Sequence, residues 1–117
     1  MSPKRGDRVA PPPATGQWEL RFATTEAVKG WEELCRQAAA NTLAAWTALR
    51  TRADNPTPTT RHHRLKGSLA NATHGGTDME QWQIEVTSSG RIWYLVDTAK
   101  RTLWIRLATT GHPSQTD

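Results

Sequence analysis

Apolar and polar residues alternate cleanly over residues 80–87, and residues 92–96 that follow are all apolar. Trp82, Ile84 and Val86 are separated by polar residues, a spacing typical of a strand with one buried face. The segments TSSGR and DTAKRT have the composition of turns. We therefore expect three antiparallel strands joined by these turns, over residues 81–87, 91–97 and 102–108.

Further upstream the apolar spacing changes from two residues to three or four, which predicts helices after a first strand at 17–23. Thr25 is expected to cap one helix and Asn41 a second, because short polar side chains accept hydrogen bonds from free N–H groups there. The two apolar stripes hold Ala27, Trp31, Leu34, Cys35 and Ala38, and then Leu43, Trp46, Leu49 and Ala53. The prolines of DNPTPTT end the second helix, so the two helices should form an antiparallel hairpin.

The predicted order of elements is β-α-α-β-β-β, which indicates an α+β domain with a two-helix hairpin packed on a small antiparallel sheet. Residues 1–16 are basic, proline-rich and without periodicity, and they predict a disordered tail. The folded domain is therefore expected to span residues 17–117.

The turn between the first two of the three late strands decides which residues share a face. A two-residue turn would place Val86 opposite Arg91, whereas a three-residue turn ending in Gly90 pairs Val86 with Ile92 and keeps charge out of the core. We predict the second register, and by extension Ile92 opposite Leu107. The predicted core face holds Trp82, Ile84, Val86, Ile92, Tyr94, Val96, Leu103, Ile105 and Leu107. The opposite face holds Gln83, Glu85, Thr87, Arg91, Trp93, Leu95, Trp104, Arg106 and Ala108.

Composition narrows the possible functions. The 117 residues carry a net charge of +4, with a pI near 9.8, which favours a polyanionic or acidic partner unless the basicity is incidental. The single cysteine, Cys35, excludes a disulfide framework and predicts a reducing compartment. No apolar run approaches the ~18 residues of a membrane span, and no hydrophobic segment follows the basic N-terminus as in a secretory signal. We expect a cytoplasmic protein that does not bind membranes.

Two helices followed by HHRLKGSL, WQIEVTSSGRIWYLV, a final strand and a short tail resemble the RelE/ParE superfamily of bacterial type II toxin–antitoxin toxins. The resemblance runs from about residue 17 to the end. Its most specific signs are LKG before the first long strand and the arginine after the hairpin turn. RelE-type members cleave mRNA in the ribosomal A site without a metal, whereas ParE-type members poison DNA gyrase. The resemblance also implies an antitoxin protein as partner and no cofactor, and it allows a degenerate member that binds RNA or antitoxin without toxicity.

By position, the resemblance places Arg91 and His112 in a candidate catalytic site. Two lysines that RelE uses on its first hairpin strand fall on Gln83 and Glu85, so that part of the site differs. Cleavage through the 2′-hydroxyl needs a base, an acid and a cation near the phosphate. Arg91 is the expected cation, and His112 and Glu85 are the expected proton carriers. Alternatively, Glu85 forms a cross-strand ion pair with Arg91 or Arg106, and His112 is a plain turn residue.

The basic run RHHRLK, at residues 61–66, is the expected contact for RNA phosphates, which give affinity without sequence choice. Tryptophans beside arginines on the polar sheet face suit stacking on bases. The alternative is a solvated run, with the 55–78 loop or the tails covering the tryptophans. The expected RNA-binding residues are Arg61, His63, Arg64, Lys66, Trp93, Trp104 and Arg106. His62, His63 and His74 lack the cysteines or spaced carboxylates of a metal site, so no metal is expected.

Overall fold

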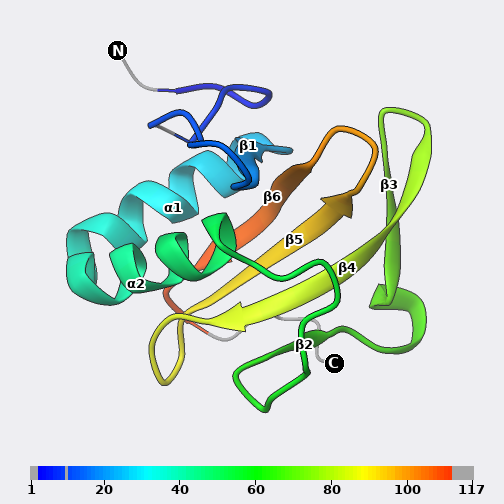
Figure 1. The fold of residues 1–117 in the computed structure, drawn as a ribbon. Coiled ribbons are helices and arrows are strands. Elements are labelled where there is room, and N and C mark those ends of the chain that lie inside the picture. The colour runs from blue at the N-terminus through cyan, green and yellow to red at the C-terminus, as the bar shows by residue number, and fades with distance from the viewer. Residues whose placement is uncertain (1–2, 10, 112–117) are drawn as a thin grey trace.

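The computed structural model describes residues 3–9 and 11–111, arranged as two helices against a six-stranded sheet (Figure 1). The elements are β1 (Glu19–Phe22), α1 (Thr25–Gln37), α2 (Ala39–Arg50), β2 (His62–Arg64), the short 3-10 helix η1 (Gly67–Leu69), β3 (Asn71–His74), β4 (Thr77–Glu85), β5 (Arg91–Asp97) and β6 (Thr102–Thr109). The predicted α+β class is confirmed.

The sheet is mixed rather than purely antiparallel. Its strand order is β1-β6-β5-β4-β2, with β3 also paired to β4, and β1 runs parallel to β6. The two strands that were not predicted, β2 and β3, pair with successive parts of the long strand β4. Both are short and polar, so neither shows the alternation that identifies a half-buried strand.

Thr24 caps helix α1. The cap lies one residue before the predicted position. The Thr24 hydroxyl accepts a hydrogen bond from the Ala27 N–H at 2.9 Å and donates one to the Arg106 carbonyl of β6. The helix lies directly on β6: a Cβ atom on Gly30 would come 1.7 Å from the Ala108 carbonyl oxygen. Only glycine allows this approach, because any side chain would overlap the strand backbone.

Helix α2 differs from its predicted form at its cap, on its buried stripe and at its end, because Ala53, expected on the stripe, lies beyond Arg50 and is exposed. It follows α1 after the single residue Ala38 and has no side-chain cap. Asn41, expected as the cap, lies inside the helix and donates a hydrogen bond to the Val86 carbonyl at 3.0 Å. Leu43, expected on the buried stripe, is 62% exposed. The helix buries a neighbouring face instead, formed by Thr42, Ala45 and Leu49.

The β4–β5 register differs from the prediction by two residues. Ile84, not Val86, lies opposite Ile92, and Glu85 lies opposite Arg91. The turn is wider than expected and is closed by a hydrogen bond from the Val86 N–H to the Gly90 carbonyl at 2.9 Å. Because the shift is an even number, each β4 and β5 side chain stays on its predicted face.

A β-bulge between Trp93 and Tyr94 changes the faces of β6. On one side of the bulge Tyr94 pairs with Ile105, and on the other Ile92 pairs with Ala108. Ala108 therefore belongs to the core, and Leu107, predicted in the core, pairs with Trp93 and is only half-buried. The extra residue in β6 shifts the alternation by one.

The N-terminal segment, predicted as a disordered tail, runs along the free edge of β1 over residues 3–9. The Val9 N–H donates to the Leu20 carbonyl at 2.7 Å, and the Gly6 N–H donates to the Phe22 carbonyl. The Val9 side chain is buried in the core. The prediction is wrong for these residues, because an exposed strand edge offers backbone partners to a segment whose composition alone predicts disorder.

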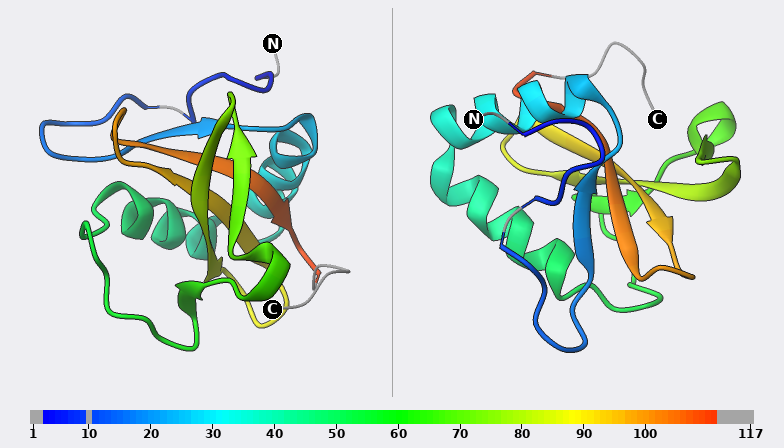
Figure 2. Two further views of the ribbon diagram at one scale, coloured as in Figure 1. Left: turned by 90° about the vertical axis from the view of Figure 1, so that its right-hand side faces the viewer. Right: turned by 90° about the horizontal axis from the view of Figure 1, so that it is seen from above.

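The sheet carries apolar layers on both faces. The main core lies between the helices and one face and contains Leu20, Phe22, Leu34, Leu49, Ile92, Tyr94, Leu103 and Ile105. Four further buried residues lie outside that cluster: Leu65, Met79, Trp93 and Leu95. In the right-hand view of Figure 2 the helices and the segment around η1 lie on opposite sides of the sheet. We call the face turned away from the helices the far face.

Candidate functional site

The predicted catalytic pair, Glu85 and Arg91, lies at the hairpin end of β4 and β5. The two residues are direct cross-strand partners, and the Arg91 Nη2 atom is 3.8 Å from Glu85 Oε2. This is the ion pair considered as the alternative to catalysis. Glu85 keeps part of its carboxylate at the surface, whereas Arg91 is only 9% exposed.

The guanidinium of Arg91 is bound to the turn itself. Nη1 donates to the carbonyls of Thr87, Ser88 and Gly90 at 3.0–3.3 Å, and Nη2 donates to Ser88 at 3.3 Å. A planar fork that spans several carbonyls is well suited to fix a turn. In this geometry Arg91 organises the hairpin and is not presented to a phosphate as predicted.

His112 lies outside the described residues. Thr109, near the end of β6, pairs with Arg91, so β6 ends beside the Glu85–Arg91 pair.

The basic run lies along one edge of the sheet. Arg61, Arg64 and Lys66 are exposed, and the Arg61 carbonyl accepts a hydrogen bond from the Glu85 N–H at 2.7 Å. His63 lies opposite Gln83, with its Nδ1 atom 3.0 Å from the Arg64 carbonyl oxygen. The structure therefore brings Arg61 next to Glu85, whereas Arg64 lies opposite Trp82 and binds Asn71 and Glu80.

Trp93 does not form an open stacking surface. It is 3% exposed, and its indole N–H donates to Gln83 Oε1 at 2.8 Å. The prediction that Trp93 stacks on RNA bases is wrong for this conformation, because its ring is shielded from solvent. The alternative stated above, that the tryptophan is covered by other parts of the chain, describes Trp93.

Trp104 and Arg106 are also engaged by their surroundings. The His74 ring lies over Trp104 with centroids 4.2 Å apart, and Arg106 Nη1 donates to Gln81 Oε1 at 3.1 Å. Gln81 also donates to the Leu69 carbonyl beside η1 at 2.9 Å. The 65–74 segment thus contacts the far face at Trp104 and at Gln81.

A buried polar cluster that the sequence did not indicate lies on the helix side of β5. The Tyr94 hydroxyl is 2.6 Å from His62 Nε2 and accepts a hydrogen bond from Arg52 Nε at 2.9 Å. Arg52 is 6% exposed, and its guanidinium lies 4.8 Å from the ring centre of Trp82 and 5.6 Å from that of Trp18. Cation–π contacts stabilise such a buried charge.

Burial fixes the protonation states in this cluster. It lowers the pKa of His62 to about 4, and the charge of Arg52 acts in the same direction. Burial raises the pKa of Tyr94, although the Arg52 charge and hydrogen bond oppose that shift. At neutral pH a neutral His62 therefore faces a protonated Tyr94, which can donate to its Nε2 atom. The cluster could have been anticipated only if His62 had been recognised as a strand residue that points into the core.

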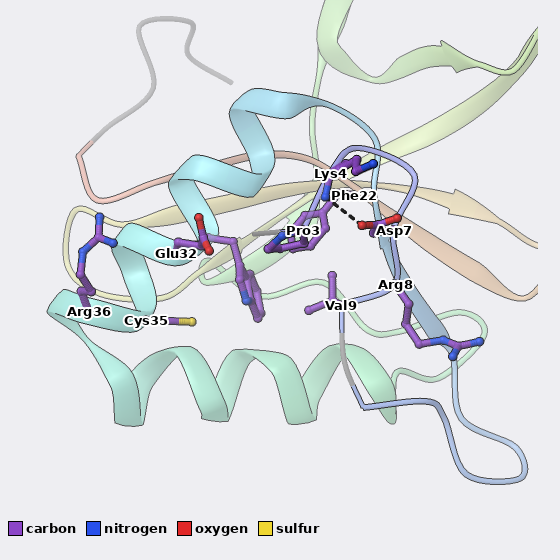
Figure 3. Close-up of a pocket in the computed structure, with 10 residues that line it drawn as sticks. Pro3, Lys4, Asp7, Arg8, Val9, Phe22, Glu32, Cys35 and Arg36 are labelled. Atoms are coloured by element: carbon purple, nitrogen blue, oxygen red, sulfur yellow. Dashed lines mark hydrogen bonds between the residues drawn. The ribbon is translucent and has the colours of Figure 1, made fainter. Parts of the chain in front are cut away.

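A wide groove lies between the N-terminal segment and α1 (Figure 3), and among the described residues that line it there is no buried polar cluster like the one around Tyr94. Val9 and Phe22 line it, together with charged residues that include Asp7 and Arg8. The Lys4 N–H donates to Asp7, and Arg8 pairs with Glu19. Burial raises the pKa of the Cys35 thiol, so it is not a reactive thiolate at neutral pH.

No family model, curated protein or solved structure matches this chain. Within residues 3–9 and 11–111, no three His, Cys, Asp or Glu side chains gather in a way that would hold a metal ion. No helix in the same residues is long and apolar enough to cross a membrane.

Proposed function

We propose that this chain is a RelE-like toxin that acts in the cytoplasm, inhibits translation and is neutralised by an antitoxin protein. One observation carries the proposal: three exposed basic residues, Arg61, Arg64 and Lys66, follow one edge of the sheet, and the first of them is hydrogen-bonded through its backbone to Glu85. Such an edge suits an RNA backbone, whose phosphates give affinity to any sequence. The two-helix hairpin and the hairpin turn followed by an arginine agree with the arrangement that the resemblance to RelE/ParE toxins implies.

In this proposal mRNA cleavage needs no metal and uses Glu85 as one proton carrier. A histidine serves as the other, because imidazole exchanges protons near neutral pH. His63 lies opposite Gln83, two residues before Glu85 on β4, and His112 follows β6 outside the described residues. Arg91 holds the turn and, through its 3.8 Å ion pair, the orientation of Glu85.

A second candidate is a toxin or a non-toxic relative that binds without chemistry, including a gyrase inhibitor. The observation that favours it is the position of Arg91, whose guanidinium is committed to turn carbonyls rather than open to a phosphate. A protein of this kind would depend on surface contacts alone.

Induced expression in a bacterial host, with pulse labelling of protein and DNA synthesis in parallel, separates the candidates. We expect protein synthesis to stop first, and replacement of Arg61, Arg64 and Lys66 by glutamine to abolish the arrest. Purified protein should cut A-site message on ribosomes in the presence of chelator, and Glu85→Gln should slow the single-turnover rate by about 10²-fold or more.

The matched control is Glu26→Gln, which removes an exposed carboxylate from the first turn of α1 and should cleave normally. If DNA synthesis stops first, the target is gyrase. If growth continues under full expression, the chain is not a toxin.

A further inference from the structure

We propose that a cleft between β4, β5 and the chain following α2 binds a guanine base. This inference rests on the proposed function, because RNA is the source of the base. The cleft holds about 290 Å³. Its buried lining comes from Arg52, Trp82 and Met79, and its exposed rim includes Asp78 and Glu80.

The buried cation leaves one hydrogen-bonding group for a ligand. Arg52 uses Nε for the Tyr94 hydroxyl and Nη1 for the carbonyls of Ala53 and Asp54. Within the described part of the chain, Nη2 has no acceptor. Since Arg52 lines the cleft and is 6% exposed, an acceptor atom bound there would satisfy this group.

The rim of the cleft carries hydrogen-bond acceptors, whereas Arg52 is a donor. Asp78 accepts a hydrogen bond from Asn71 through Oδ2 at 3.1 Å, while its Oδ1 has no donor among the described residues. Glu80 is held by the Trp82 indole N–H at 3.1 Å and by Arg64 at 3.7 Å. A carboxylate has room for several donors, so Asp78 is the group best placed to accept from a ligand.

Guanine matches this combination among the four RNA bases. Its Watson–Crick edge carries an acceptor, O6, beside two donors, N1–H and N2–H, which one carboxylate can accept together, while arginine donates to O6 or N7. Adenine and cytosine present a ring nitrogen acceptor where guanine has N1–H, and uracil has one donor between two acceptors. Arg64 lies beside the rim, where it pairs with Glu80 at 3.7 Å and donates to Asn71 Oδ1 at 2.6 Å.

The test is calorimetric titration of the full chain with 5′-GMP, AMP, CMP and UMP at low salt. We expect GMP to bind about ten-fold or more tightly than the other three. Asp78→Asn should remove this preference, because the amide sets a donor against the guanine donors. Glu26→Gln, a change of the same kind on α1, should leave it unchanged.

Equal affinity for all four nucleotides would mean that the cleft, at most, holds phosphate, and would overturn the inference. Absence of binding at millimolar nucleotide would overturn it as well. Loss of guanine preference in a chain that still arrests translation counts against this inference alone. Guanine selectivity in a chain that leaves translation intact counts against the proposed function alone.

Discussion

Both faces of the sheet carry buried side chains, but the two layers are built differently. On the helix face, two helices bury a continuous set of large side chains against β1, β5 and β6. On the far face, the polar segment at residues 65–74 contacts the sheet through the His74 ring over Trp104 and through Gln81, which is completely buried. Gln81 donates to the Leu69 carbonyl and accepts from Arg106. Strand alternation therefore shows which side chains share a face, and it does not show whether that face is open.

The largest effects should come from equal truncations on the two faces. Ile105 and Leu95 are both buried in the sheet. Ile105→Ala leaves a cavity between the sheet and the helices and should cost about 4 kcal/mol of unfolding free energy, whereas Leu95→Ala should cost about 2 kcal/mol because neither α1 nor α2 packs on the far face and the residues there can settle inward. Urea unfolding measures both. Equal losses would show that the far-face cover is as rigid as the helices.

The close approach of α1 to β6 gives a second test of the rigid face. Gly30→Ala should destabilise the fold by about 3 kcal/mol, since the new methyl group meets backbone that cannot rotate away. Gly111→Ala is the matched control, because a Cβ there meets nothing within 4 Å. If Gly30→Ala unfolds at the same urea concentration as the control, the helix does not lie on β6 as described.

The buried histidine, His62, should make the folding stability of the protein depend on pH. The pKa of His62 falls from an ordinary 6.5 to about 4 on folding, so the unfolded chain binds more protons between these values. Stability is then fully present above about pH 6.5 and decreases as pH falls toward 4, by on the order of 1–3 kcal/mol. His62→Gln should flatten this part of the stability profile, and His74→Gln on the far face should not. A His62→Gln profile that keeps the wild-type slope would assign the dependence to other groups.

The smallest expected effect concerns the open end of the far face. Arg91→Lys keeps the charge but loses the fork that binds three carbonyls, and we expect a loss of about 1 kcal/mol. Arg36→Lys, on the exposed end of α1, should be neutral. If both variants unfold alike, the guanidinium does not hold the turn and Arg91 is free for another role.

The parts of this fold that were predictable are those with a strong period. Spacing along the sequence was enough for β4, β5, β6 and the helical hairpin, and the identity of the two faces of β4 and β5 was correct. The register was missed by two residues, because it depends on a turn shaped by the Arg91 side chain. The bulge at Trp93 was missed because both registers of β6 leave an apolar residue in the core.

The polar clusters were harder to predict because they depend on burial of polar groups. Arg52 and His62 lie in segments with the composition of loops, and the contacts that permit their burial come from tryptophans and a tyrosine elsewhere in the chain. In contrast, the ion pair between Glu85 and Arg91, expected as the alternative to catalysis, is present, although the predicted register does not place the two residues opposite each other. What the sequence could not indicate was that Arg91 would bind the turn.

The parallel pairing of β1 with β6 has a consequence for how the chain folds. β6 lies between β1 and β5, and the Thr24 cap of α1 is anchored to an Arg106 carbonyl 82 positions later. Contacts this distant in sequence form late, because closing the intervening loop costs entropy before any native pairing compensates. We therefore expect the helical hairpin and β1 to remain unsettled during synthesis until β6 has emerged, and the whole domain then to fold in a single cooperative step.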